Sequence, residues 1–300
     1  MFDGRVTLLD AGMGKDLKMR GVEVPDTIWS ANALLVAPEV VLDVHRENIE
    51  AGADVITTNT YGVIRGDLAK ECIEDQYAAL NRRAGEIALA AVRGTKRRVS
   101  IAGSLPPLNG SYRPDLVHAF DELEPQYQEQ ASLLAPFVDL YLCETMSNTI
   151  EARAAAAGAS SVGKPILVSY TLHDELPVRL RSGETLREAV DAVAEFDPAA
   201  VLVNCCLPER ITDAMPVLRE LVNGHTGGYA NAFSHVPKDW LLDGDKAGDG
   251  TLELRDDLEP DRYARFAAAW VAEGATIVGG CCGTVAAHTA ALRHAIDSSV

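Results

Sequence analysis

The chain has 300 residues, of which 47% are hydrophobic, and it carries a formal net charge of −17 at pH 7. This acidic balance argues against a nucleic-acid-binding protein, because phosphates are bound by basic surfaces. No apolar stretch reaches the roughly 18 residues of a membrane span, and the N-terminus lacks the basic and apolar segments of a signal peptide.

Short apolar runs alternate with longer amphipathic segments along the chain. The runs predict strands at residues 6–10, 53–59, 99–104, 138–144, 165–170, 200–205, 227–231 and 275–280, the seventh being the weakest. The amphipathic segments predict helices, among them residues 38–51, 72–93 and 114–134. Eight strands separated by helices are typical of a parallel sheet.

Two features favour a closed barrel over an open sheet. The only early glycine motif, Gly12-Met13-Gly14, lacks the third glycine of a dinucleotide-binding turn. Polar or reactive residues also follow nearly every strand, whereas an open sheet concentrates its chemistry at one switch point. These residues are Asp10, Asn59, Ser104, Glu144, Tyr170, Cys205, Asn231 and Cys281. We therefore predict an α/β fold, a (β/α)8 TIM barrel that forms a single domain over residues 1–300.

The longest irregular stretch, residues 233–259, is rich in Asp, Gly and Lys. Loops of this length in compact domains are usually functional or disordered. Because it follows a late strand, we expect it to lie over the barrel mouth, where it can close on substrate.

The six cysteines do not resemble a secreted disulfide framework, so we expect reduced thiols in a cytoplasmic protein. Cys72, in a predicted helix, and Cys143, in a predicted strand, are interpreted as small hydrophobic residues. His45, His118, His173 and His288 do not lie at strand ends, and we expect them at the surface.

The remaining cysteines form two adjacent pairs, Cys205-Cys206 and Cys281-Cys282, at the ends of the sixth and eighth strands. Because neighbouring strand residues face opposite ways, only one of the first pair should face the mouth. Glycines around the second pair let the chain turn and present both sulfurs. Three converging thiolates predict a site for a soft cation, with zinc the leading candidate and one coordination position open for catalysis. A four-cysteine structural site, a redox pair and inert packing remain alternatives.

Several motifs together resemble the zinc-dependent homocysteine S-methyltransferases, a (β/α)8 family. The motifs span most of the chain, and the late combination of Asn-Cys with Gly-Gly-Cys-Cys is the most specific. They cover residues 8–14 (LLDAGMG), 51–61 (AGADVITTNTY), 103–105 (GSL), 143–145 (CET), 203–205 (VNC) and 279–283 (GGCCG).

The resemblance implies that Cys205, Cys281 and Cys282 bind Zn²⁺ and that Cys206 faces away. It also implies that Asp10 and Glu144 hold the amino-acid part of homocysteine, and that Tyr61 lies near the metal as a fourth ligand or substrate contact. We expect further substrate contacts from polar residues near the strand ends, namely Thr58, Asn59, Ser104, Asn204 and Asn231. Many relatives have a proline before the Asn at the seventh strand end, where this chain has Ala230.

The implied reaction is methyl transfer from a small sulfonium or ammonium donor to homocysteine, forming methionine. The chain is too short for appended folate and cobalamin modules, so we expect a free donor: S-methylmethionine first, then S-adenosylmethionine, betaine or another sulfonium. Candidate aromatic residues for a cage around the cationic methyl group are Trp29, Tyr61, Tyr112, Phe233 and Trp240. A thiol redox barrel and a non-catalytic zinc- or methyl-donor-binding protein are the alternatives. The sequence predicts small-molecule partners and gives no oligomeric state.

Overall fold

The computed structural model describes residues 4–238, 240–241 and 252–298. Eight parallel strands form one sheet in the order β1-β8-β7-β6-β5-β4-β3-β2, and a single parallel bridge between Leu9 and Val55 joins its two edges. The strands are β1 (Thr7–Leu8), β2 (Val55–Thr57), β3 (Ser100–Leu105), β4 (Leu140–Met146), β5 (Ile166–Tyr170), β6 (Ala200–Asn204), β7 (His225–Tyr229) and β8 (Ile277–Val278). The predicted (β/α)8 barrel is confirmed.

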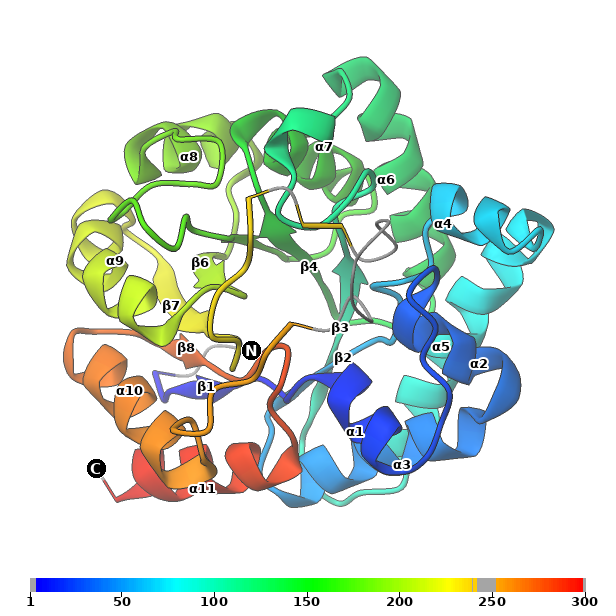
Figure 1. Cartoon of the computed structure of the whole chain (residues 1–300), viewed down its shortest axis with the longest axis horizontal. Helices are drawn as coiled ribbons and strands as arrows, with labels where there is room; N and C mark the ends of the chain where they lie inside the picture. The colour runs from blue at the N-terminus through cyan, green and yellow to red at the C-terminus, as the bar shows by residue number, and fades with distance from the viewer. Residues whose placement is uncertain (1–3, 239, 242–251, 299–300) are drawn as a thin grey trace.

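Helices surround the barrel on the outside (Figure 1). The α-helices are α1 (Met13–Met19), α2 (Asn32–Val36), α3 (Pro38–Glu50), α4 (Arg65–Lys70), α5 (Tyr77–Arg93), α6 (Phe120–Leu134), α7 (Thr149–Ser160), α8 (Leu186–Val193), α9 (Pro208–Leu221), α10 (Pro260–Ala272) and α11 (Ala286–Asp297). Short 3₁₀ helices are η1 (Trp29–Ala31), η2 (Glu74–Gln76), η3 (Pro114–Leu116) and η4 (Ala194–Phe196). None of the described helices has both the length and the apolar character that a membrane crossing requires.

Alternating side chains on the strands build two separate apolar layers. In β4, Leu140 and Leu142 point into the barrel, where they pack with Leu9, Leu202 and others. Their neighbours Tyr141 and Cys143 pack instead in the layer between barrel and helices. This period of two is the expected geometry of a strand buried on both faces. Cys143 is therefore a core residue, as predicted.

Local signals set where helices begin. At the start of α8, the Thr185 hydroxyl accepts the N–H of Glu188 at 3.2 Å, and the Glu188 carboxylate accepts the N–H of Thr185 at 2.7 Å. This reciprocal capping satisfies backbone donors that the first helical turn leaves unpaired.

Sequence predictions about three single residues are wrong. Cys72 is exposed and lies in a turn with φ +56°, because α5 begins only at Tyr77. His45 and His288 are buried, whereas His118 is exposed as expected. His45 lies on the buried face of α3, where burial lowers its pKa to about 4. The Nε2 atom of His288 forms a hydrogen bond with the carbonyl of Leu258 at 3.1 Å. This bond connects α11 to the segment that precedes α10.

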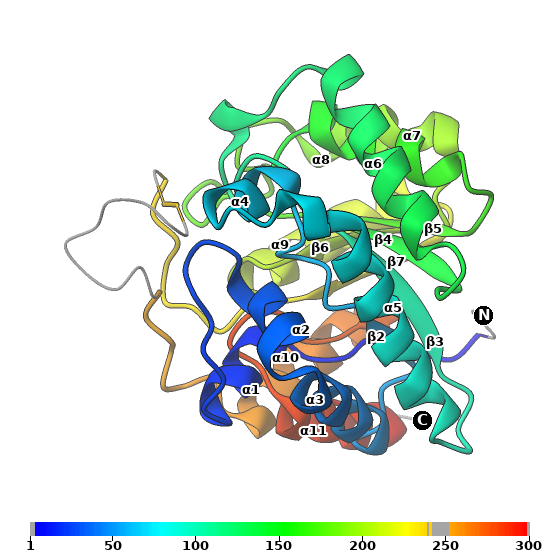
Figure 2. The same cartoon turned by 90° about the vertical axis from the view of Figure 1, so that its right-hand side faces the viewer.

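The segment after β7 was predicted to cover the barrel mouth. Its residues 239 and 242–251 lie outside the described residues. The described flanks run side by side as an antiparallel pair, with a bridge between Phe233 and Leu254 (Figure 2). The N–H of Arg255 also donates to the carbonyl of Ala232 at 2.8 Å. Both flanks border the cavities described below, so this part of the segment lies at the mouth.

Candidate active site

Three cysteine sulfurs converge at the C-terminal rim of the barrel. The Sγ atoms of Cys205, Cys281 and Cys282 all lie within 4.8 Å of one another. Cys205 directly follows β6, and the other two follow β8. Cys206 is fully buried in the outer apolar layer, so only one member of the first pair faces the mouth, as predicted.

The backbone of Cys205 is held in an uncommon conformation. Its φ of +49° lies in the left-handed region, which residues other than glycine adopt only when the surroundings enforce it. Two hydrogen bonds do so here: the Cys205 N–H donates to the Tyr229 carbonyl at 3.0 Å, and the Thr171 hydroxyl donates to the Cys205 carbonyl at 3.2 Å. This turn aims the sulfur at the other two.

Glycines let the first and last strand ends approach each other closely. A Cβ on Gly12 would lie 2.5 Å from the carbonyl oxygen of Cys281, and Gly283 has φ +83°. The Thr284 hydroxyl donates to the Cys281 carbonyl at 2.7 Å and accepts the N–H of Gly12 at 3.2 Å. The missing side chain of Gly12 and the positive φ of Gly283 thus let the Cys281-Cys282 turn lie beside β1.

The thiols affect one another's ionisation. Burial opposes ionisation of Cys205, but hydrogen bonds with Cys281, Cys282 and Tyr112 more than offset it and bring its pKa well below the usual value. Burial raises the pKa of Cys281, and the hydrogen bond with Cys205 raises that of Cys282, in both cases well above the usual value. The Cys205 thiolate therefore suppresses ionisation of the other two thiols. Only a cation lets all three ionise together, so the donor set fits a soft divalent metal.

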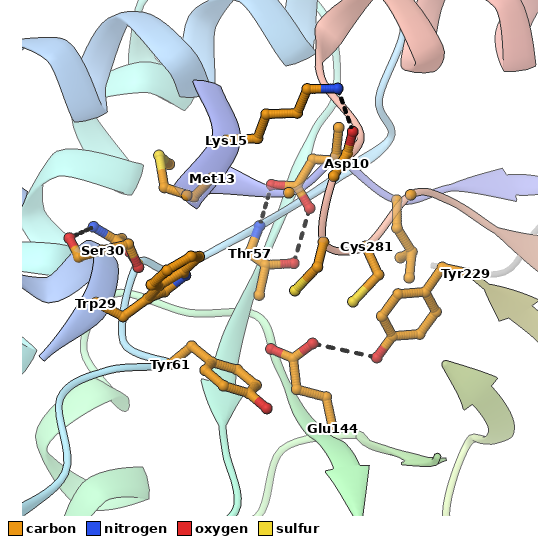
Figure 3. A pocket seen from close by; sticks show the side chains of 18 of the residues that line it. Asp10, Met13, Lys15, Trp29, Ser30, Thr57, Tyr61, Glu144, Tyr229 and Cys281 are labelled. Atoms are coloured by element: carbon orange, nitrogen blue, oxygen red, sulfur yellow. Dashed lines mark hydrogen bonds between the residues drawn. The ribbon is translucent and has the colours of Figure 1, made fainter. Parts of the chain in front are cut away.

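Two carboxylates enter the cavity next to the sulfurs. The N–H and hydroxyl of Thr57 donate to Asp10 at 2.8 and 3.0 Å. Glu144 accepts hydrogen bonds from the hydroxyls of Ser104 at 2.5 Å and Tyr229 at 3.4 Å. Burial raises the pKa of each to about 7. Among the described residues no Lys, Arg or His forms an ion pair with either, so the site has two acceptors for an external cation (Figure 3).

Tyr61 lies beside the sulfurs, as expected. Its hydroxyl is 2.7 Å from that of Ser111, and burial, reinforced by the nearby Cys205 and Cys282, raises its pKa well above the usual value. Thr58 and Asn59 line the same cavity. The Asn59 amide donates to the carbonyl of Ser30 at 2.9 Å, which connects the end of β2 to η1.

Other predicted site residues lie behind the cavity walls. Ser104 reaches the site through Glu144. The Asn204 amide donates to the Thr145 hydroxyl at 2.8 Å and contacts the Cys281 sulfur at 3.8 Å. Asn231 is buried, and its side chain accepts the N–H of Phe233 at 3.2 Å. None of these three borders the two cavities described here.

Sequence reasoning did not assign the roles of several residues that hold the site, although it named Tyr112 as a candidate for the aromatic cage. Thr57 and Tyr229 bond the two carboxylates, and Tyr112 places its hydroxyl 3.0 Å from the Cys205 sulfur. Thr57 lies two residues after Val55, whose side chain packs inside the barrel, so period-two alternation was a signal for it. Tyr112 comes from a loop between β3 and η3, and no local pattern indicates its partner.

Two cavities meet at the sulfur cluster. The larger, of about 410 Å³, contains Asp10, Glu144, Cys281 and Cys282 in its wall. The smaller, of about 300 Å³, shares Cys282 with it. All five aromatic candidates line this smaller cavity: Trp29, Tyr61, Tyr112, Phe233 and Trp240. The arrangement can hold two small molecules with their reacting ends at one sulfur-rich point.

Comparisons with known proteins agree with this geometry. The family model for homocysteine S-methyltransferase matches residues 7–296. The chain is 30% identical to a homocysteine S-methyltransferase of Escherichia coli, covering 96% of this chain and 94% of that protein. It is 28% identical to a selenocysteine methyltransferase of Astragalus bisulcatus, covering 94% and 89%. The crystal structure of the Escherichia coli homocysteine methyltransferase MmuM in its metallated form superposes with a TM-score of 0.80 at 28% identity, covering 97% and 96% of the two chains.

Proposed function

Because the chain belongs to the homocysteine S-methyltransferase family, we propose that it methylates homocysteine with a small sulfonium or ammonium donor, S-methylmethionine first, at a zinc ion bound by Cys205, Cys281 and Cys282. The observation that carries this proposal is that two cavities share Cys282: one contains two carboxylates that have no cationic partner among the described residues, and the other is lined by aromatic rings.

The sulfur cluster fits zinc by its chemistry. Three thiolates with room for one further ligand are a catalytic zinc site, and a structure of a related methyltransferase is described as metallated. Bound zinc would keep the homocysteine sulfur in its reactive thiolate form at neutral pH. The chain itself supplies a buried, largely apolar surrounding that excludes water.

The larger cavity suits an amino-acid acceptor. Asp10 and Glu144 would bind its ammonium group, because both carboxylates are buried without a cationic partner among the described residues. Lys15 and Lys18 line the same cavity and would face its carboxylate. Thr58 and Asn59 complete the predicted contacts. Tyr61 lies where the two cavities meet and would orient the acceptor sulfur toward the donor.

The smaller cavity suits the methyl donor. Aromatic faces attract cations such as a sulfonium or quaternary ammonium. A volume of about 300 Å³ lies at the small end of ligand sites, which favours S-methylmethionine or betaine over the larger S-adenosylmethionine. Transfer neutralises the donor's charge as the methyl group moves to sulfur, so positioning and exclusion of water are what the protein must provide.

A labelled transfer assay tests the proposal. Purified protein with its zinc quantified is offered homocysteine labelled with ¹³C in its backbone, together with S-methylmethionine, S-adenosylmethionine or betaine in parallel. Labelled methionine can come only from methylated homocysteine. It is thereby distinguished from the unlabelled methionine that S-methylmethionine becomes when it loses a methyl group. We expect labelled methionine with S-methylmethionine and none from metal-stripped protein. One equivalent of zinc without labelled methionine from any donor would contradict the proposed reaction while leaving the metal site.

We further propose that residues 1–300 act as one domain in a reducing, cytoplasmic location. The support is that the strand order runs through the whole described chain and that the six cysteines do not resemble a secreted disulfide framework.

A further inference from the structure

The loop after β3 brings a tyrosine hydroxyl to one sulfur of the cluster. Tyr112 is 4% exposed, and its hydroxyl lies 3.0 Å from the Sγ of Cys205. When Cys205 is a thiolate it has no proton to give, so the phenol must be the donor in this bond. Tyr112 has φ +65°, so the loop adopts an uncommon backbone conformation at the residue that makes this contact.

A buried cation lies over the face of this ring. The guanidinium carbon of Arg181 is 4.9 Å from the centroid of the Tyr112 ring. Trp240 packs against the same ring edge-on, with 5.4 Å between centroids. A cation over an aromatic face is attracted to it, and it withdraws electron density from the phenol, which strengthens the O–H as a donor.

Arg181 is itself held by a buried ion pair. It lies 3.1 Å from Asp174, and the two side chains are only 5% and 3% exposed. The pair also binds both backbone groups of one residue: the N–H of Val236 donates to Asp174 at 3.0 Å, and Arg181 donates to the Val236 carbonyl at 3.2 Å. Val236 belongs to the segment after β7 and packs in one apolar cluster with Tyr112 and Cys205. Three loops are thus fixed around the Cys205 sulfur.

We propose that Tyr112 is a positioning residue that donates a hydrogen bond to the Cys205 thiolate and that the Asp174–Arg181 pair holds it there, so that this bond sets how strongly Cys205 donates to the metal. The inference rests on the proposed zinc site and adds a group outside its ligand set. Hydrogen bonds to metal-bound sulfur reduce its electron donation, and residues that orient metal ligands typically alter affinity or activity about 10–100-fold.

The test uses Tyr112→Phe, which keeps the ring but removes the hydroxyl. The control is Tyr170→Phe, which removes another buried tyrosine hydroxyl, one that bonds the Ala189 carbonyl at 2.7 Å and belongs to a ring packed in the outer apolar layer. Each protein is loaded with Co²⁺, and its sulfur-to-metal charge-transfer band is recorded. We expect the band to move to longer wavelength in Tyr112→Phe only, because the Cys205 sulfur then donates more strongly to the metal. Zinc affinity in a chelator competition should still fall roughly tenfold, because the Cys205 thiolate loses the hydrogen-bond donor that stabilises and orients it before the metal binds.

A double variant, Asp174→Asn with Arg181→Gln, provides a second arm. It removes both charges together and so leaves no unpaired buried charge. We expect a smaller band shift in the same direction, and this arm decides the question if Tyr112→Phe does not fold. An unchanged band in Tyr112→Phe, even with weaker zinc binding, would assign the tyrosine a purely structural role and overturn the inference. If the wild-type protein takes up no metal, the proposed zinc centre fails first and the inference falls with it.

Discussion

Asp10 and Glu144 enter one cavity from strands β1 and β4, and burial raises the pKa of both carboxyls to about 7. Each is stabilised by hydrogen bonds from hydroxyl groups rather than by a cation among the described residues. Ionisation of these two buried carboxyls therefore destabilises the ligand-free protein. An ammonium group bound between them would offset this cost.

This arrangement predicts an unusual pH dependence of stability. The usual pKa values of these carboxyls are 3.8 and 4.5. Between those values and about 7 the folded state binds more protons than the unfolded state, so stability falls as pH rises through this window. For metal-free protein, raising the pH from 5 to 8 should cost about 2–3 kcal/mol per carboxyl. Urea unfolding of Asp10→Asn should show a smaller loss than wild type; equal losses would contradict the prediction.

The metal-ligand assignment predicts a contrast between two cysteines, one from each of the adjacent pairs. Cys282→Ala should lose zinc and turnover together, with activity falling at least about 100-fold. Cys206→Ala is the matched control, because its side chain packs in the outer apolar layer. It should keep one equivalent of zinc and lose only about 1 kcal/mol of stability. Metal analysis and the methionine assay on both variants check this, and retained zinc with normal turnover in Cys282→Ala would refute it.

The close approach of β1 to the cysteine turn predicts that Gly12 does not tolerate a side chain. A Cβ would lie 2.5 Å from the Cys281 carbonyl, closer than van der Waals contact permits, so Gly12→Ala must displace the sulfur-bearing turn. We expect zinc affinity to fall roughly tenfold or more, as measured by chelator competition. Gly94→Ala, at the C-terminal end of α5 with no contact under 3.4 Å, should leave zinc affinity unchanged. Equal affinities in the two variants would contradict the steric argument.

Asn204 is predicted to be a structural centre beneath the sulfurs. Its side-chain oxygen accepts the N–H of Thr145 at 2.9 Å and the hydroxyl of Ser169 at 2.8 Å. Asn204→Ala leaves these buried donors unpaired and should lower the free energy of unfolding by about 2–4 kcal/mol. Ser169→Ala removes one donor only and should cost about 1 kcal/mol. Chemical denaturation of both variants measures the difference between their free energies of unfolding. Similar losses in the two variants would show that Asn204 is not the centre of this hydrogen-bond network.

Strand-end reasoning predicted the elements of the site that depend on topology. A parallel barrel brings the ends of all strands to one rim, so Asp10, Glu144 and the cysteine set could be placed together from sequence. Tyr112 could not be placed, because its position depends on the path of a loop and on packing against Arg181. His45 was misplaced for a different reason. It lies on the same buried face of α3 as Val41 and Val44. The surface prediction rested on the polarity of histidine and neglected this helical periodicity.

The sulfur cluster spans strands that are not neighbours. Cys205 follows β6, Cys281 and Cys282 follow β8, and β7 lies between these strands. A metal bound by the three side chains would therefore be a removable cross-link that closes a loop of chain containing α9, β7 and α10. Such a link restricts the unfolded chain more than the folded one. Binding of the metal should thus stabilise the last quarter of the barrel, including the flanks of the segment after β7. Folding of the chain would then depend on the supply of the ion.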